Sequence, residues 1–260
     1  MSEPSENRIL VVELLAPGTG IGLYNPARSI FYLRSSASAG AADDTFTYGP
    51  AGLGWTPLVG DWDGDGADTI GLYNPTRGMF YLRNANSNGI ANATFIYGPS
   101  GRGWQPLTGD WNGDGNDTIG LYDPAAGRFY LRYTNDSGIA DVSFRYGPNG
   151  LGWLALTGDW DGNGTDTIGL YDPLNGRFYL RNSNSQGIAD AAFVYGPANL
   201  GWTPLVGDWD GDSTDTIGLY NADAGRYYLR NSNSNGIADV NARYGPAPSS
   251  WMPLSGAWGN

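Results

Sequence analysis

The chain has 260 residues, of which 40% are hydrophobic, and carries a formal net charge of −12. This length allows one large β domain or two ordinary domains, and the apolar share is enough for a core. The absence of Cys and His excludes disulfides, imidazole-ligated zinc and histidine-based catalytic triads, and the acidic balance makes nucleic acid a poor partner.

The first 15 residues precede the repetitive part of the chain and contain a short apolar run at residues 9–12. This run is too short for a membrane span or for the apolar region of a signal peptide, so membrane insertion is not expected. Residues 6–13 lie one repeat length before residues 55–62 and resemble a strand. We interpret residues 1–15 as a linker or as an extra strand laid on a sheet edge.

From residue 16 onward, a phrase close to GDWDGDGADTIGLY recurs every 49 residues. Its leading glycines are Gly60, Gly109, Gly158 and Gly207, with a truncated copy at Gly256. A fixed period of this size indicates one supersecondary unit copied in tandem. The copy at residues 105–153 contains four short β-like segments separated by turns rich in Gly, Pro, Asn and Asp, and no segment has a helical period.

Four-stranded units of roughly 40–50 residues are typical of propeller blades. The IGLY segment occurs five times, beginning at residues 21, 70, 119, 168 and 217. The chain ends just after a first strand whose own blade never follows, and residues 16 onward supply the other three strands. We therefore predict an all-β fold: a five-bladed β-propeller over residues 16–260, closed by N- and C-terminal strands that share one blade.

Fourteen of the 26 acidic residues sit in four loops, one between the first and second strands of each complete copy. Oxygen-bearing side chains stand at positions one, three, five and eight, and a Gly at position six permits a sharp bend, which suits Ca²⁺. The candidate ligands are Asp61, Asp63, Asp65, Asp68, Asp110, Asn112, Asp114, Asp117, Asp159, Asp161, Asn163, Asp166, Asp208, Asp210, Asp212 and Asp215.

This pattern predicts about four structural calcium ions, one in each acidic loop. Ser213 replaces the position-six Gly, so the fourth loop is expected to bind less tightly. In the first blade, residues 12–20 stand at the equivalent place and lack the acidic pattern. The alternative is that Asp, Asn and Gly simply form turns that cap their own backbone.

The acidic loops resemble the FG-GAP and VCBS-type repeats of integrin α-subunit heads and bacterial surface proteins. The resemblance covers about residues 16–260, and it implies structural calcium on one rim of the ring and a role in adhesion or ligand binding. The chain departs from the family pattern in having five copies rather than seven, and at position nine of each loop. Thr69, Thr118, Thr167 and Thr216 stand there in place of an acid, which leaves the last ligand open between the position-eight Asp and this Thr.

All ten Trp residues occupy two positions of the repeat. The set within the acidic loops is predicted to pack between blades; it comprises Trp62, Trp111, Trp160, Trp209 and Trp258. The other set follows a Gly-rich turn and is expected to be partly exposed; it comprises Trp55, Trp104, Trp153, Trp202 and Trp251. This second set is a candidate stacking platform for sugar rings, with blade packing as the alternative.

Two further features recur in each copy. An Arg ends the third strand, at Arg83 for example, and is interpreted as one half of a solvated surface pair with an acid. The polar loop that follows, such as residues 84–92, is interpreted as a hairpin turn in which Asn adopts left-handed dihedrals.

These patterns favour a non-catalytic, extracellular or cell-surface binding module that is stabilised by calcium and binds glycan or a cell-surface protein at several sites. The alternative is a structural or scaffolding repeat domain of a larger surface protein that self-associates through its terminal strands. An enzyme is least favoured, because the acids recur identically in every copy and catalysis usually breaks symmetry at one place. The sequence does not predict an oligomeric state.

Overall fold

The computed structural model describes residues 18–259, and within them the only regular elements are β-strands. No helix capable of crossing a membrane is found among these residues. The strands are β1 (Gly20–Asn25), β2 (Ile30–Arg34), β3 (Asp44–Thr47), β4 (Thr56–Gly60), β5 (Thr69–Asn74), β6 (Met79–Leu82), β7 (Ala93–Ile96), β8 (Gln105–Gly109), β9 (Thr118–Asp123), β10 (Arg128–Leu131), β11 (Val142–Arg145), β12 (Leu154–Gly158), β13 (Thr167–Asp172), β14 (Arg177–Leu180), β15 (Ala191–Val194), β16 (Thr203–Gly207), β17 (Thr216–Asn221), β18 (Arg226–Leu229), β19 (Val240–Arg243) and β20 (Met252–Gly256).

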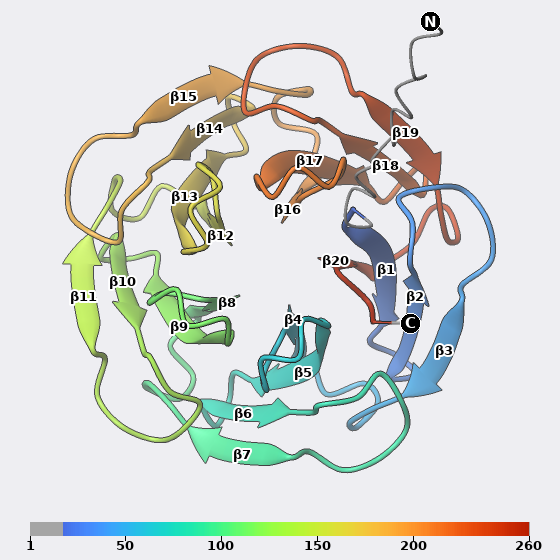
Figure 1. Ribbon diagram of the computed structural model, residues 1–260, viewed down its shortest axis with the longest axis horizontal. Coiled ribbons are helices and arrows are strands. Elements are labelled where there is room, and N and C mark those ends of the chain that lie inside the picture. The colour runs from blue at the N-terminus through green and yellow to red at the C-terminus, as the bar shows by residue number, and fades with distance from the viewer. Residues whose placement is uncertain (1–17, 260) are drawn as a thin grey trace, which may run out of the picture.

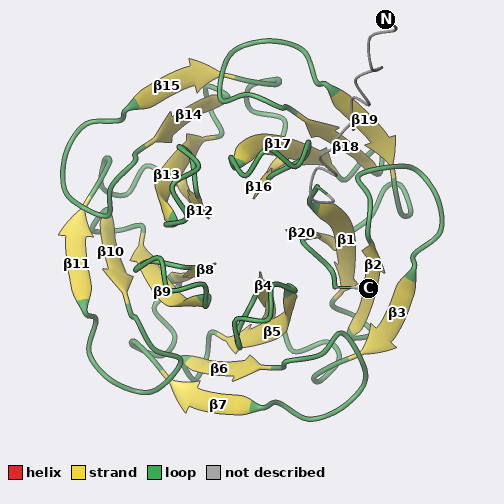
Figure 2. Cartoon of the chain, viewed as in Figure 1, coloured by secondary structure: helices red, strands yellow, loops and turns green. Residues whose placement is uncertain are grey.

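These strands form five four-stranded antiparallel sheets, arranged as blades around a central opening (Figure 1). Blade 1 contains β20, β1, β2 and β3; blades 2 to 5 contain β4–β7, β8–β11, β12–β15 and β16–β19. In each blade the first strand lies nearest the axis and the fourth lies outermost, and loops alone connect the strands (Figure 2). The predicted five-bladed propeller is confirmed.

Blade 1 is completed by the last strand of the chain. β20 pairs antiparallel with β1, with Gly22 opposite Leu254, so strands from both ends of the chain share one sheet. The predicted closure is therefore also confirmed. The interpretation of residues 1–15 as a linker or extra strand falls outside the described residues.

Burial explains why the sequence of the second strand in each blade is almost continuously apolar. β5 is buried at all six of its residues because blades pack against both of its faces. Its Gly71 has no room for a side chain: a Cβ there would lie 2.9 Å from a Leu82 methyl carbon. The third strand β6 instead alternates between partly exposed and buried residues, as its sequence pattern predicts.

The hydrophobic core is divided among the boundaries between blades. Each of five apolar clusters joins two neighbouring blades, and the cluster between blades 2 and 3 packs Trp62 and Phe80 against Ile119 and Leu121. The Trp residues of the acidic loops are buried in these clusters, which confirms their predicted packing role. Because each blade contributes residues to two clusters, a blade buries its apolar faces only when it has both neighbours.

The innermost strands are sheet edges that face the axis. Proline occupies the second position of four of them, at Pro57, Pro106, Pro204 and Pro253. Proline fits an edge strand because it has no N–H to leave unpaired. In β12 this residue is Ala155, and the side chain of Gln105 in β8 binds both of its backbone groups: Gln105 Nε2 donates to the Ala155 carbonyl at 2.7 Å, and the Ala155 N–H donates to Gln105 Oε1 at 3.0 Å.

Candidate functional site

The first Asp of each acidic loop shapes the loop through its own backbone. The Asp61 carboxylate, just after β4, accepts hydrogen bonds from the N–H groups of Gly64, Asp65 and Gly66 at 2.8, 3.2 and 2.7 Å. Asp110, Asp159 and Asp208 accept equivalent bonds in their loops. The capping role of the position-one Asp is therefore present in all four loops.

Position six of the loop requires a left-handed backbone. Gly66 has a φ of +85° there, and Ser213 in the fourth loop keeps a φ of +70° despite its side chain. A non-glycine residue in this region is strained. Ser213 in place of the position-six Gly therefore keeps the shape of the fourth loop but makes that backbone conformation less favourable.

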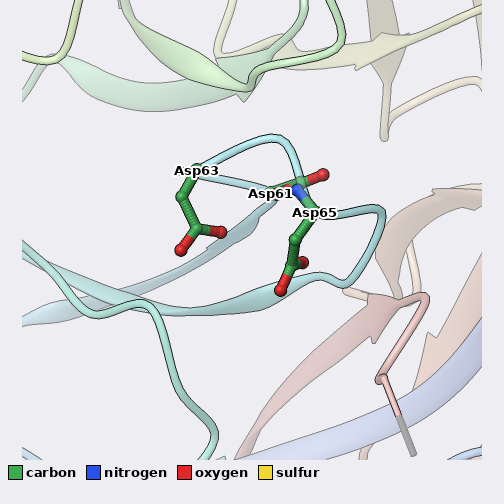
Figure 3. Close-up of side chains that lie close together, drawn as sticks. All are labelled: Asp61, Asp63 and Asp65. Atoms are coloured by element: carbon green, nitrogen blue, oxygen red, sulfur yellow. Dashed lines mark hydrogen bonds between the residues drawn. The ribbon is translucent and has the colours of Figure 1, made fainter.

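Two loops gather three carboxylates each. Asp61, Asp63 and Asp65 have oxygens within 4.8 Å of one another, and Asp208, Asp210 and Asp212 form the same cluster in blade 5. Figure 3 shows that the three blade 2 side chains rise from a single turn. In the middle two loops an amide replaces one carboxylate, and in blade 3 Asn112 donates to Asp114 at 2.9 Å. In blades 2 and 5 the side chains at positions one, three and five therefore lie together, and their role as metal ligands stays a prediction.

The position-eight aspartates lie elsewhere, at the boundary with the preceding blade. The Asp61 N–H donates to Asp117 Oδ2 at 2.8 Å, and the Asp117 N–H donates back to the Asp61 carbonyl at 2.7 Å. The same pair of bonds joins Asp110 with Asp166 and Asp159 with Asp215. We call this arrangement the blade clamp.

The two remaining boundaries use modified clamps. Asp68 pairs with Ala257 between blades 2 and 1, and Thr19 Oγ1 accepts from the Asp208 N–H at 2.9 Å between blades 1 and 5. Glycine makes the clamp possible, since a Cβ at Gly109 would lie 2.9 Å from the Asp166 carboxylate. Asp68, Asp117, Asp166 and Asp215 were candidate metal ligands, but the structure gives them clamp hydrogen bonds and does not include them in the carboxylate clusters.

The clamp aspartates also line the central channel, a cavity of about 300 Å³ between the innermost strands. Burial raises the pKa of Asp68 to about 6 and that of Asp215 to about 7. Burial and then the charge of Asp68 raise the pKa of Asp117 to about 8, and burial raises the pKa of Asp166 well above its ordinary value. The channel therefore holds a ring of carboxyl groups that resist ionisation.

The five Trp residues of the candidate stacking platform are partly exposed, and each stacks on a Tyr from the third strand of its blade. The ring centroids of Trp55 and Tyr81 are 4.6 Å apart, with an angle of 16° between the ring planes. The matching pairs are Trp104 with Tyr130, Trp153 with Tyr179, Trp202 with Tyr228 and Trp251 with Tyr32. Each blade thus presents one flat aromatic pair at the same place in the ring.

The recurrent arginine organises the polar loop that follows it. Arg83 donates to the carbonyls of Ser87, Asn88 and Ile90, each at 2.8 Å, and so binds the inside of its own loop. The expectation of a solvated surface pair was incomplete: Arg34, for example, does lie 3.6 Å from Asp43, but its side chain is only 19% exposed.

The left-handed asparagines expected in the polar loop are also absent from the described residues, where the non-glycine residues with positive φ are Ser29, Asn199 and Ser213. The loop instead uses Asn86, whose amide donates to the Asp68 carbonyl at 2.8 Å. Asn84 donates to Asp63 at 2.7 Å. The polar loop and the acidic loop of a blade are therefore neighbours, which sequence spacing did not indicate.

A buried hydroxyl at each blade boundary was also missed from the sequence. The Tyr of the recurrent YGP segment is buried in every copy, and its hydroxyl has no hydrogen-bond partner within the described structure. These residues are Tyr48, Tyr97, Tyr146, Tyr195 and Tyr244. The sequence signal for these tyrosines is the YGP segment, which recurs every 49 residues from Tyr48.

No protein-family model and no curated protein matches the chain. Among solved structures, the chain is similar to a lectin from Agrocybe aegerita, whose structure explains the specific recognition of non-reducing terminal N-acetylglucosamine. The TM-score is 0.46 and the identity 13%, and the alignment covers 92% of this chain and 71% of the lectin chain.

Proposed function

We propose that this chain is a non-catalytic, multivalent binding module that holds glycans on its aromatic pairs. The observation that carries the proposal is the partly exposed stack of Trp55 on Tyr81 and its equivalents in the other blades. A rigid aromatic face with one polar edge suits the apolar face of a sugar ring and the hydroxyls at its rim. Equivalent weak sites around one ring add avidity for a multivalent surface, such as a glycan or a glycosylated cell-surface protein.

Calcium is the second part of the proposal. Asp61, Asp63 and Asp65 supply hard oxygen donors from one turn, and their grouping fits a Ca²⁺ ion better than a softer metal. When bound, the ion would neutralise carboxylates that otherwise repel one another. The relationship to FG-GAP and VCBS-type repeats is proposed on the same loops.

The number of charged ligands favours a setting rich in calcium. Each loop offers two or three carboxylates at positions one, three and five, and sites with few charged ligands bind calcium weakly, at about 10⁻⁴–10⁻³ M in extracellular modules. Such affinities are useful at the calcium concentrations outside cells. We therefore place the proposed function at the cell surface or in the extracellular space.

A glycan array tests the binding function. The chain is labelled with a fluorophore and applied in about 1 mM calcium and again in excess EDTA. The calcium concentration is chosen to fill sites with the affinities given above. Binding to at least one glycan, weaker in EDTA, is expected. A matched variant with Leu174→Ala, an exposed residue that belongs to none of the Trp–Tyr stacks, serves as a control for surface change. A folded chain that binds no glycan in either buffer would refute the proposal.

The scaffolding alternative is less favoured at the C-terminal strand. Within the described residues, the C-terminal strand β20 pairs with β1 inside the same ring, so that pairing edge is not available to another copy. Outer strands are partly capped as well, because the Thr47 N–H in β3 donates to Asn88 Oδ1 of the next blade at 2.7 Å. Light scattering that shows a discrete species over a range of concentrations would agree with these contacts.

A further inference from the structure

A groove of about 450 Å³ lies at the boundary between blades 1 and 2. Blade 1 contributes Tyr48 and the turn after it, and blade 2 contributes the Trp55–Tyr81 stack and the loop that carries Ile90. A volume of this size is at the lower end of the range for small-molecule sites, and such sites are mostly apolar with few polar groups. The groove therefore suits one sugar residue better than a peptide or a long polymer segment.

Tyr48, one of the residues that line the groove, carries an unsatisfied polar group. The residue is only 4% exposed, lines the groove, and has a hydroxyl without a hydrogen-bond partner. A buried hydroxyl left unpaired is unfavourable, and pairing it would favour a bound state. A ligand hydroxyl or carbonyl that reaches Tyr48 would gain that hydrogen bond.

The five aromatic pairs differ in what stands beside them. In blade 3 the Arg128 guanidinium lies 5.6 Å from the centroid of the Tyr130 ring and donates to Ser143 at 2.8 Å. In blade 4, Arg177 lies 5.5 Å from the centre of the Tyr179 ring. A guanidinium over the ring is charged and hydrated, so it keeps water next to the stack. Binding of a neutral, partly apolar ligand at that stack is therefore less favourable.

Blade 2 has no such arginine beside its stack. Met79 occupies the position of Arg128, and Ile90, 85% exposed, borders the groove. Blade 1 also has an apolar residue, Ile30, at the Met79 position, but Ala41 replaces Ile90 in its loop. Blade 2 is thus the one blade in the ring that combines the apolar neighbour with the exposed isoleucine.

We infer that the groove between blades 1 and 2 is the principal ligand site, and that it takes a neutral monosaccharide bearing an apolar substituent, such as an acetamido or deoxy methyl group. Trp55 and Tyr81 stack on the ring, Ile90 covers the substituent, and the Tyr48 hydroxyl pairs with a polar group of the sugar. The inference rests on the proposed glycan binding and adds that the ring is functionally asymmetric.

Calorimetric titration tests this site with the methyl glycosides of N-acetylglucosamine and fucose, using that of glucose as the unsubstituted control. At least one substituted glycoside should bind more tightly than the glucoside, at one strong site per chain. Ile90→Ala and Tyr48→Phe should each weaken binding about three- to tenfold, the range for one lost contact or hydrogen bond. Met79→Arg should weaken it about tenfold by giving blade 2 the arginine of blade 3.

The matched controls are Ile188→Ala, at an equally exposed position in blade 4, and Tyr146→Phe at the boundary of blades 3 and 4. Both should leave the affinity unchanged, and thermal unfolding verifies that every variant is folded. This inference would be overturned by equal losses of affinity in the control variants, by five equal sites per chain, or by no preference for a substituted sugar. In each of these cases a positive glycan array would still support the proposed function. A negative array would overturn both.

Discussion

The hydroxyl of Tyr227 in blade 5 donates a hydrogen bond to the main-chain carbonyl of Gly22 in blade 1. The two residues are 205 positions apart, and the bond crosses the boundary where the ring closes. The other four blades have phenylalanine at this position. Blade 5 also has Ala242 where the others have a second phenylalanine, and Tyr227 and Ala242 lie in the same cluster with Ile21. The repeat is therefore altered at its closure, with a smaller residue beside a side chain that reaches across.

Tyr227→Phe should destabilise the ring, because it removes this bond and leaves the rest of the cluster unchanged. The expected loss is about 1 kcal/mol, the usual net value of such a hydrogen bond, or roughly 2–4 °C in the unfolding midpoint. Differential scanning calorimetry measures it. The control is Tyr97→Phe, which deletes a buried hydroxyl that has no partner and should not destabilise the chain. Equal losses in both variants would contradict the closure role.

The architecture could be predicted because it depends on repeated local chemistry. Local backbone or burial requirements explain the glycines of the acidic loop, the continuous apolar second strand and the alternating third strand. The number of copies predicts the number of blades. The buried Trp62 set was predicted for the same reason, since one large apolar side chain per repeat has to pack against the next blade.

Contacts between neighbouring loops could not be predicted in this way. The carboxylates of Asp61 and Asp117 belong to the same motif, yet one caps its own loop and the other bonds to the previous blade. That difference depends on how two blades are oriented, which spacing within one repeat does not specify. For the same reason, the repeat spacing did not predict the Arg83 contacts or the unpaired hydroxyl of Tyr48.

The blade clamp predicts a stability that falls as pH rises. Burial raises the pKa of Asp117 from 3.8 to about 8, so between these values the folded chain holds a proton that the unfolded chain has released. The unfolded state then binds fewer protons, and the stabilisation, complete below the unfolded pKa, is lost as pH rises through the folded pKa. In EDTA, the unfolding midpoint should therefore be several degrees lower near pH 8 than near pH 5.

Asp117→Asn isolates the contribution of this carboxyl group. The amide oxygen can still accept the Asp61 N–H, but the side chain no longer ionises, so the variant should show a flatter pH profile and a higher midpoint near pH 8. Asp44→Asn, an exposed substitution on β3 away from the channel, should retain the wild-type slope. An unchanged slope in Asp117→Asn would show that another group dominates the titration.

Calcium should stabilise the folded chain in proportion to the logarithm of the free ion concentration once its sites begin to fill. Asp63→Asn should reduce this calcium-dependent gain, because it removes one of three clustered carboxylates and gives blade 2 the amide that Asn112 supplies in blade 3. In EDTA its midpoint should change little, since the Asp61 caps remain. Fluorimetric unfolding over a calcium series measures both effects.

Asp123→Asn is the matched control for this series. It makes the same chemical change at the last residue of β9, where blades 1, 2 and 5 already carry asparagine. Its response to calcium should equal that of the unmodified chain. A midpoint that does not move with calcium in the unmodified chain would remove the metal proposal altogether, whatever the variants show.

The arginine inside the polar loop predicts a local effect. Arg83→Lys keeps the charge but cannot reproduce the donations to Ser87, Asn88 and Ile90, because an ammonium group lacks the planar fork of a guanidinium. Hydrogen exchange should therefore quicken about tenfold in residues 84–92, for a local loss of roughly 1–1.5 kcal/mol. Arg77→Lys, on the exposed turn after β5, should leave exchange in that loop unchanged. Because Arg83 holds the Ile90 carbonyl in place, Arg83→Lys should also weaken sugar binding at the groove between blades 1 and 2. If both hydrogen exchange in residues 84–92 and sugar binding stayed as in the unmodified chain, the loop would not need its internal arginine.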